Sequence, residues 1–347
     1  MAEGLEQEGQ DTEEQIADDP LAEDEGNVSS PRLELEAATA EGEIWTVAEM
    51  EAAEPIPLEI DDERLKEVVE ELVGPPEAME EGAGTVSEGG APEATAEEAV
   101  EPTATSGGYN YPGPYTVYEV GRIAPYTRYP YCTVGKLFFK QNGRSYVGSA
   151  ASIGNYAVFT AGHCVHTGNG KASGWSTNVV FVPAYKNGAT PYGQWNASYL
   201  TTRTRWYNKG IPNGLTEDMG GAVLHKLGGR KISQRVGWLG AAWNWPRYQH
   251  WHAVGYPAAA PYNGKLMWDT QASFAYNGSV SGIKPVGIGC DMTGGCRGGP
   301  WIRRFGSGQH LNGVNSYRNR SKPKELFSPY FDNRAKSLLD ALTKGTP

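Results

Sequence analysis

VFTAGHCV, residues 158–165, joins a short apolar stretch to a small-residue turn and places a histidine directly after it. Valine and phenylalanine favour a β-strand, and a following Ala-Gly pair is typical of a strand end. Histidine is the side chain whose ordinary pKa lies nearest neutral pH, so it exchanges protons readily there. His163 is therefore the first candidate for acid–base chemistry, and the strand before it is the first indication of a β fold.

Most of the chain after Tyr109 has the same kind of sequence, with short β-prone runs separated by Gly, Asn and Pro. Seven of them predict strands: 134–140, 146–153, 157–160, 179–183, 221–227, 252–256 and 311–315. Strands this short and this regularly interrupted predict a sandwich or a pair of barrels. Only 329–342 has helical periodicity, with Leu338, Leu339 and Leu342 on its apolar side.

An acidic residue opens another informative stretch, TEDMGGAVL at 216–224. Asp218 follows His163 by 55 positions and lies closer than Glu217 to the apolar run. A carboxylate buried against an imidazole orients the ring and stabilises its protonated form. Because residues 109–347 contain only 8 acids, Asp218 is the better candidate for that partner, the alternative being a solvated acid in a turn.

The third stretch, CDMTGGCRGGPW at 290–301, is a glycine-rich loop. Glycine allows a sharp backbone turn whose amides face an oxyanion. The sequence resembles loops that present a nucleophilic hydroxyl or thiol. Arg297 has neither, and its guanidinium stays protonated at any relevant pH.

In chain order and local sequence, the three stretches resemble the histidine, aspartate and nucleophile motifs of the trypsin/chymotrypsin-type serine peptidases. Matches to the glutamyl-endopeptidase-like branch extend the resemblance over residues about 120–342, through Arg122, YPYCTVGKLFF at 129–139, VGYP at 254–257 and GVNS at 313–316. The resemblance implies an all-β fold of two packed six-stranded antiparallel β-barrels, with the site between them and a short C-terminal helix after them.

Roles for seven residues follow from the resemblance. His163 and Asp218 are the catalytic base and its orienting acid, Arg297 replaces the nucleophilic serine, Gly295 supplies an oxyanion amide, and the specificity pocket includes Thr293, Asn315 and Ser316. The prediction is a serine-endopeptidase family protein whose hydrolysis is impaired or lost. The alternative is a non-catalytic peptide-binding or regulatory protein that uses the same cleft.

The four cysteines leave several possibilities open. A thiol can replace a serine hydroxyl, so Cys296 is an alternative nucleophile, although the loop would have to rebuild around it. It can equally pair with Cys290 or simply pack. In the family the counterpart of Cys164 pairs with a cysteine that should fall near Gly148, so Cys164 is either free or paired with Cys132.

Substrate preference is also left open by the sequence. Glutamyl endopeptidases carry a histidine where this chain has Asn315. The basic charge of the C-terminal part can favour acidic substrates by steering, or it can hold the acidic N-terminal part, and we favour the second explanation.

Charge divides the chain into two unlike parts. Residues 1–108 contain 33 acidic and 3 basic residues, a net charge of −30, whereas residues 109–347 contain 8 acidic and 27 basic residues, a net charge of +19. We predict an acidic, propeptide-like segment at 1–108 and a peptidase domain at 109–347. Low aromatic content predicts disorder for 1–42 and 74–108, and apolar periodicity predicts a helix at 61–73 that docks on the basic domain. Trp45, Met50 and Pro55 resemble propeptide sequence of the family.

The sequence also leads us to expect that several features are absent. The start of the chain has no secretory signal pattern and no apolar run long enough to span a membrane, although the family is usually secreted. We expect a monomer that takes a peptide or protein substrate, with the acidic segment as an intramolecular partner and with no nucleic acid, membrane or cofactor. His250 and His252 share a strand face that could suit a metal, but packing beside Trp251 is favoured because no third ligand is near in sequence.

Overall fold

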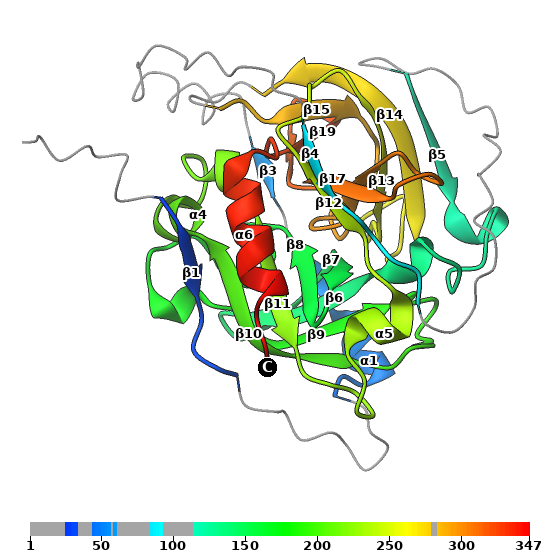
Figure 1. The fold of residues 1–347 in the computed structure, drawn as a ribbon, viewed down its shortest axis with the longest axis vertical. Coiled ribbons are helices and arrows are strands. Elements are labelled where there is room, and N and C mark those ends of the chain that lie inside the picture. Colours follow the sequence, from blue (N-terminus) through cyan, green and yellow to red (C-terminus); the bar gives the residue numbers. More distant parts are fainter. Residues whose placement is uncertain (1–24, 34–43, 57, 61–83, 93–113, 279–282) are drawn as a thin grey trace, which may run out of the picture.

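The computed structural model describes residues 25–33, 44–56, 58–60, 84–92, 114–278 and 283–347. The helix predicted at 61–73 lies outside these residues. Within them the protein is mostly β, with two sheets and a C-terminal helix (Figure 1). The predicted fold class is confirmed.

The first sheet closes into a six-stranded barrel. Its strands are β6 (Val134–Gln141), β7 (Arg144–Gly154), β8 (Ala157–Thr160), β9 (Thr177–Pro183), β10 (Trp195–Arg203) and β11 (Gly220–Leu224). They pair in the order β10-β11-β8-β7-β6-β9, and antiparallel pairing of β9 with β10 completes the barrel. Apolar side chains from every strand fill the interior, among them Leu137, Val147, Val158, Phe181, Leu200 and Ala222.

The second sheet has eleven strands, of which eight come from the chain after the barrel. These are β12 (Gly240–Trp243), β13 (His250–Gly255), β14 (Trp268–Asn277), β15 (Val286–Gly289), β16 (Pro300–Arg303), β17 (His310–Val314), β18 (Tyr317–Asn319) and β19 (Lys322–Ser328). Strand β5 (Tyr115–Glu119) pairs with β14. The pairing of β12 with β17 is parallel, which departs from the purely antiparallel sheets that the resemblance implied.

Helices occupy the connections. They are α3 (Gly162–Val165), α4 (Thr204–Lys209), α5 (Ile232–Val236) and α6 (Asn333–Thr343), and 3₁₀ turns occur at Val120–Arg122, Tyr131–Thr133, Ala172–Gly174 and Leu215–Glu217. Helix α6 is the predicted C-terminal helix, and it begins at 333 because Asp332 caps its first turn. It packs on the barrel beside β10 and β11 (Figure 1). There Leu342 lies against Gly221 of β11.

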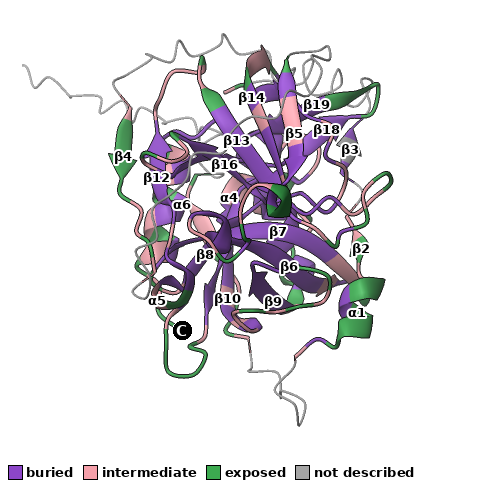
Figure 2. Ribbon diagram, turned by 90° about the vertical axis from the view of Figure 1, so that its right-hand side faces the viewer, coloured by how far each residue is buried: buried purple, intermediate pink, exposed green. Residues whose placement is uncertain are grey.

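Pieces of the acidic segment are added to both sheets. Strand β1 (Asn27–Ser29) pairs with β10 and β2 (Glu54–Pro55) with β7, whereas β3 (Glu59–Ile60) pairs with β18 and β4 (Thr85–Ser87) with β12. Strands β1 and β4 lie inside the ranges expected to be mostly disordered, 1–42 and 74–108, where backbone pairing to an existing sheet needs little apolar content. Helix α1 (Val47–Ala52) precedes β2 and shows an exposed outer face, whereas the strands of both sheets are largely buried (Figure 2).

Candidate active site

His163 lies in α3, immediately after barrel strand β8, and it is held by one carboxylate at two points. Its backbone N–H donates to Asp218 Oδ1 at 2.8 Å, and its ring Nδ1 donates to Asp218 Oδ2 at 2.8 Å. The histidine is 3% exposed and the aspartate 0%. The pairing predicted from the sequence is therefore present in the structure, and it leaves Nε2 as the ring atom free to exchange a proton.

Asp218 and Glu217 are neighbours in the chain but contact different groups, and Asp218 is the one that contacts His163. Glu217 pairs with Arg203 at 2.7 Å and with Arg334 at 3.2 Å. Asp218 also accepts a hydrogen bond from Ser316 Oγ at 2.5 Å. Ser316, assigned from the sequence to the specificity pocket, is thus in contact with the dyad.

Burial and pairing act in opposite directions on the two groups. Burial of the ring is the largest single influence and lowers the pKa of His163, but the interactions with Asp218 and Cys164 together raise it by more, and the net change is upward. Burial is likewise the largest single influence on Asp218 and raises its pKa, but the His163 ring, the Ser316 hydroxyl and the His163 backbone N–H together lower it by more, and the net change is downward. Both changes favour an imidazolium–carboxylate pair, which is the state a general base reaches once it has taken a proton.

The glycine-rich loop lies between β15 and β16 of the second sheet and is pinned to the barrel. Ser149 donates from its backbone N–H to Arg297 O at 2.7 Å and from its hydroxyl to Gly295 O at 2.9 Å. Gly295 and Gly298 have φ of +95° and +84°, in the region that favours glycine. A Cβ at Gly298 would lie 2.0 Å from Thr160 Oγ1, so only glycine fits this close approach.

Arg297 therefore has its backbone beside the strand end that carries His163. The following residue, Gly298, approaches Thr160 and Ala161, which precede the histidine by three and two positions. The side chain of Arg297 is buried, 2% exposed, and Nη2 donates to Leu58 O of the N-terminal segment at 3.4 Å. The loop thus brings position 297 to the dyad, and the group it carries there is a guanidinium.

The two remaining pocket candidates have partners inside the protein. The Asn315 amide donates to Val254 O and Cys296 O at 3.1 and 2.9 Å and accepts from Trp301 Nε1 at 2.7 Å. Its side chain therefore holds the loop to the sheet. Thr293 is half-buried and donates from Oγ1 to Ala259 O at 2.6 Å. Their part in a specificity pocket, like the oxyanion role of Gly295, stays a prediction.

All four cysteines are free and buried. Cys296 is 0% exposed in an apolar cluster of the second sheet with Cys290 and Trp301, and burial raises the pKa of its thiol. Both features oppose thiolate formation, so the alternative nucleophile is not supported by the structure. A Cβ built on Gly148 would lie 2.9 Å from Cys164 Sγ, which is where the family resemblance placed the missing disulfide partner.

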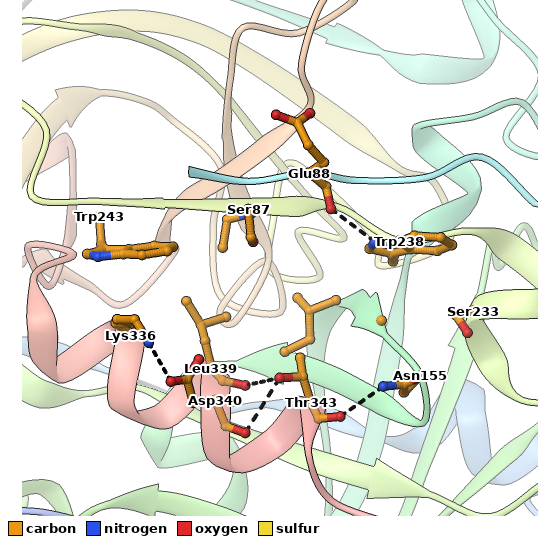
Figure 3. Close-up of a pocket in the computed structure, with 13 residues that line it drawn as sticks. Ser87, Glu88, Asn155, Ser233, Trp238, Trp243, Lys336, Leu339, Asp340 and Thr343 are labelled. Atoms are coloured by element: carbon orange, nitrogen blue, oxygen red, sulfur yellow. Dashed lines mark hydrogen bonds and ion pairs between the residues drawn. The ribbon is translucent and has the colours of Figure 1, made fainter. Parts of the chain in front are cut away.

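Two other sites can be compared with the dyad. His252 donates from Nδ1 to Asp269 Oδ2 at 2.9 Å and stacks on Phe305, so its ring is used in packing. A pocket of about 340 Å³ lies between the β4 segment and α6, with Trp238 and Trp243 at its sides (Figure 3). Neither His163 nor Asp218 lines this pocket, so the candidate site is elsewhere.

No protein-family model matches the chain, and no curated protein matches it. Among solved structures, it is similar to the protease Anisep from Arthrobacter nicotinovorans, with 34% identity, a TM-score of 0.57 and coverage of 62% of this chain and 96% of that one. It is also similar to a thermostable serine protease, AL20, from an extremophilic microorganism, with 37% identity, a TM-score of 0.57 and coverage of 62% and 98%.

A more distant similarity supports the fold alone. A Glu endopeptidase in complex with MPD matches at 15% identity with a TM-score of 0.51, covering 66% of this chain and 97% of that one. Among the described residues, no helix combines the length and apolar character that crossing a membrane requires.

Proposed function

The chain belongs to the serine proteases of chymotrypsin-like fold, and we propose that it keeps the general-base half of their site while lacking the nucleophile. The observation that carries the proposal is Arg297, which stands in a loop pinned beside His163. A serine peptidase attacks the scissile carbonyl with a hydroxyl whose proton the histidine takes. Here the base and its orienting acid are assembled, and no hydroxyl stands at position 297.

A guanidinium cannot substitute for that hydroxyl. It carries only donors, stays protonated, and has no lone pair with which to attack carbon. The predicted consequence is a protein that binds peptide but hydrolyses it weakly or not at all.

Peptide binding without cleavage is the second candidate function, and a specific contact favours it. Residues Glu59 and Ile60 form a strand beside β18, and Arg297 donates to the carbonyl of Leu58. Addition of an extended strand to a sheet is a common mode of peptide recognition. Arg297 then acts as a donor to the bound main chain instead of taking part in bond cleavage.

The test is hydrolysis of an unbiased peptide library by the full chain. Because residues 58–60 lie on the Arg297 side chain, the assay uses the double variant Leu58→Asp, Ile60→Asp as well as the native protein. We expect no cleavage by either. Cleavage that disappears when His163→Ala is added would overturn the proposal. The same library also tests the less favoured explanation of the basic charge, a preference for acidic peptides, through peptide retention by the double variant.

A further inference from the structure

Two basic side chains lie opposite each other on the hairpin of β16 and β17. Arg303, the last residue of β16, pairs in register with His310, the first residue of β17. Directly opposed residues of an antiparallel pair share one face of the sheet, so both side chains lie on the same face. They are 8% and 3% exposed. The hairpin therefore holds an arginine and a histidine side by side in a largely buried position.

The hydrogen-bonding groups of this pair are unsatisfied within the part of the chain that the structure describes. Nε and Nη1 of Arg303 and both ring nitrogens of His310 are buried there without a hydrogen-bond partner. A buried polar group without a partner costs free energy, and a buried charge without one costs more. Because Arg303 keeps its charge at any relevant pH, its guanidinium is a cation that lacks an acceptor for its N–H groups.

An indole ring holds the guanidinium in place. Cζ of Arg303 lies 3.6 Å from the centre of the Trp245 ring, and Trp245 Nε1 donates to Thr85 O of β4 at 3.2 Å. The cation–π contact stabilises the positive charge, but it accepts no hydrogen bond from Nε or Nη1. The arginine is therefore positioned for a ligand that carries negative charge and accepts hydrogen bonds.

The surrounding charges leave this position electropositive. Burial lowers the pKa of Arg303 most, and the charge of Arg304, which is exposed, lowers it further. Glu88 of the β4 segment has its Oε2 3.9 Å from His310 Nε2, which is too far for a hydrogen bond, and its side chain is 81% exposed. The Glu88 carboxylate points away from α6 and from the pocket described above (Figure 3). One solvated acid thus faces two arginines and a histidine.

The pair is separate from the candidate active site and from that pocket. His310 begins β17, whereas Ser316, which contacts Asp218, follows the other end of this strand. The strand itself spans about 13 Å. Neither Arg303 nor His310 lines the pocket beside α6. The unsatisfied donors of the hairpin therefore have no part in the site already described.

We propose that Arg303 and His310, with Arg304 at the rim, bind a small tetrahedral oxyanion, phosphate or sulfate. Such an ion accepts hydrogen bonds from several directions at once, which suits donors that come from two strands. Its charge compensates the buried guanidinium, and its oxygens provide the acceptors that the N–H groups lack. The bound ion joins the two strands of the hairpin. This proposal does not depend on the proposed function.

The experiment titrates the full-length native protein and Arg303→Met with sodium sulfate, with sodium chloride holding the ionic strength constant. Isothermal calorimetry gives the dissociation constants. Methionine keeps an apolar side chain on Trp245 while removing the charge and the donors. We expect saturable binding to the native protein and at least about tenfold weaker binding to the variant. Sodium phosphate should behave like sulfate, whereas sodium acetate, with a single charge, should bind the native protein at least about tenfold more weakly.

Urea denaturation gives a readout that distinguishes a binding arginine from a structural one. In chloride alone, Arg303→Met should be at least as stable as the native protein, because it removes a buried charge without a counter-ion. Sulfate should then stabilise the native protein and leave the variant unchanged, since a ligand stabilises only the folded state that binds it.

Arg144→Met is the matched control. Arg144 also lies over an aromatic ring, that of Tyr146 at 5.7 Å, but its side chain is 65% exposed and pairs with Glu54. This variant should keep the native affinity for sulfate. Glu88→Gln should bind sulfate about threefold more tightly, because a carboxylate near the ion repels it. Weaker binding by Glu88→Gln would contradict the placement of the ion beside His310.

Further outcomes decide the proposal. Absence of saturable sulfate binding to the native protein would overturn it, as would an equal loss of affinity in Arg303→Met and Arg144→Met, which would indicate a generally basic surface. Equal affinities for acetate and sulfate would overturn the tetrahedral class. If Arg303→Met does not fold, His310→Phe replaces it, since phenylalanine keeps a ring without nitrogens. We expect about fivefold weaker sulfate binding by His310→Phe, and unchanged affinity would overturn the proposal.

Discussion

The barrel side and the second-sheet side of the candidate site differ in which parts of a serine-protease-like arrangement each one has. On the barrel side, His163 and Asp218 retain both the residue types and the hydrogen bonds that a general base needs. On the side of the second sheet, the loop retains its glycines and its attachment to Ser149, but its central side chain is Arg297. Under the proposed function, the backbone framework of this loop is thus separable from the side chain at position 297. Backbone contacts preserve the loop, whatever side chain it carries.

The largest effect we expect comes from breaking that framework with Gly298→Ala. The new Cβ would meet Thr160 Oγ1 at 2.0 Å and Ser149 O at 2.3 Å, with φ at +84°. Overpacking against backbone and an unfavourable φ together should lower the free energy of unfolding by about 4 kcal/mol, measured by urea denaturation. Gly143→Ala is the control, because its φ is +76° and nothing lies within 4 Å of its Cβ position. It should cost about 1 kcal/mol, and equal losses at the two positions would contradict the account.

Removing the buried carboxylate on the barrel side should lower the free energy of unfolding somewhat less than Gly298→Ala does. Asp218→Ala removes a fully buried acceptor of three hydrogen bonds, from His163 N, His163 Nδ1 and Ser316 Oγ. We expect a loss of about 3 kcal/mol in the free energy of unfolding. Asp340→Ala, which removes an exposed partner of Lys336 on α6, should cost less than about 1 kcal/mol. A loss at Asp218 no larger than at Asp340 would show that the dyad is not a buried pair.

The dyad should also make stability depend on pH. The pKa of His163 is raised in the folded state, so its contribution is complete below the ordinary histidine pKa near 6.5 and is lost as pH rises above that value. The pKa of Asp218 is lowered, so its contribution is complete above the ordinary aspartate pKa and is lost as pH falls below about 4. Relative to His163→Gln, the native protein should lose up to about 1.4 kcal/mol per pH unit above pH 6.5. A flat difference between the two proteins from pH 6.5 to 9 would contradict this pairing.

The smallest effect should come from a surface contact of strand β2. Glu54 and Arg144 pair at 2.7 Å with both side chains more than half exposed, at 62% and 65%. Glu54→Gln should change the free energy of unfolding by less than about 0.5 kcal/mol, measured by urea denaturation. It should leave hydrogen exchange of residues 316–321 unchanged, because the buried side chains of Leu58 and Ile60 hold strand β3 beside β18. A large change in either measurement would mean that charge, and not apolar packing, holds this segment in place.

Much of the fold was predictable because its signals are local. Seven of the strands in the two sheets and the C-terminal helix follow from short β-prone runs and from one apolar helical face, and His163 and Asp218 follow from motif and order. Strand β10, which closes the barrel, was missed although its nine residues include Trp195, Ala197, Tyr199 and Leu200, because polar residues interrupt that pattern.

The rest of the site depends on tertiary pairing that no local pattern records. Strand β3 has two residues, and two residues carry no periodicity, so its position beside β18 was invisible in the sequence. Ser316 was assigned to a pocket because the family resemblance places it there, whereas its contact with Asp218 requires the two sheets to meet. The buried Trp45 and Met50 were noticed through family resemblance, and their burial in the barrel core gives that match a physical reason.

The most direct test of the central claim is covalent labelling by a fluorophosphonate probe, which reacts with an activated serine hydroxyl. The Leu58→Asp, Ile60→Asp protein with Arg297 intact should take no label. The same protein with Arg297→Ser should be labelled at position 297, and His163→Ala should abolish that label. Labelling of the protein that keeps Arg297, lost on His163→Ala, would contradict the account. A folded Arg297→Ser protein that takes no label when Leu58 and Ile60 are both replaced by Asp would contradict it as well.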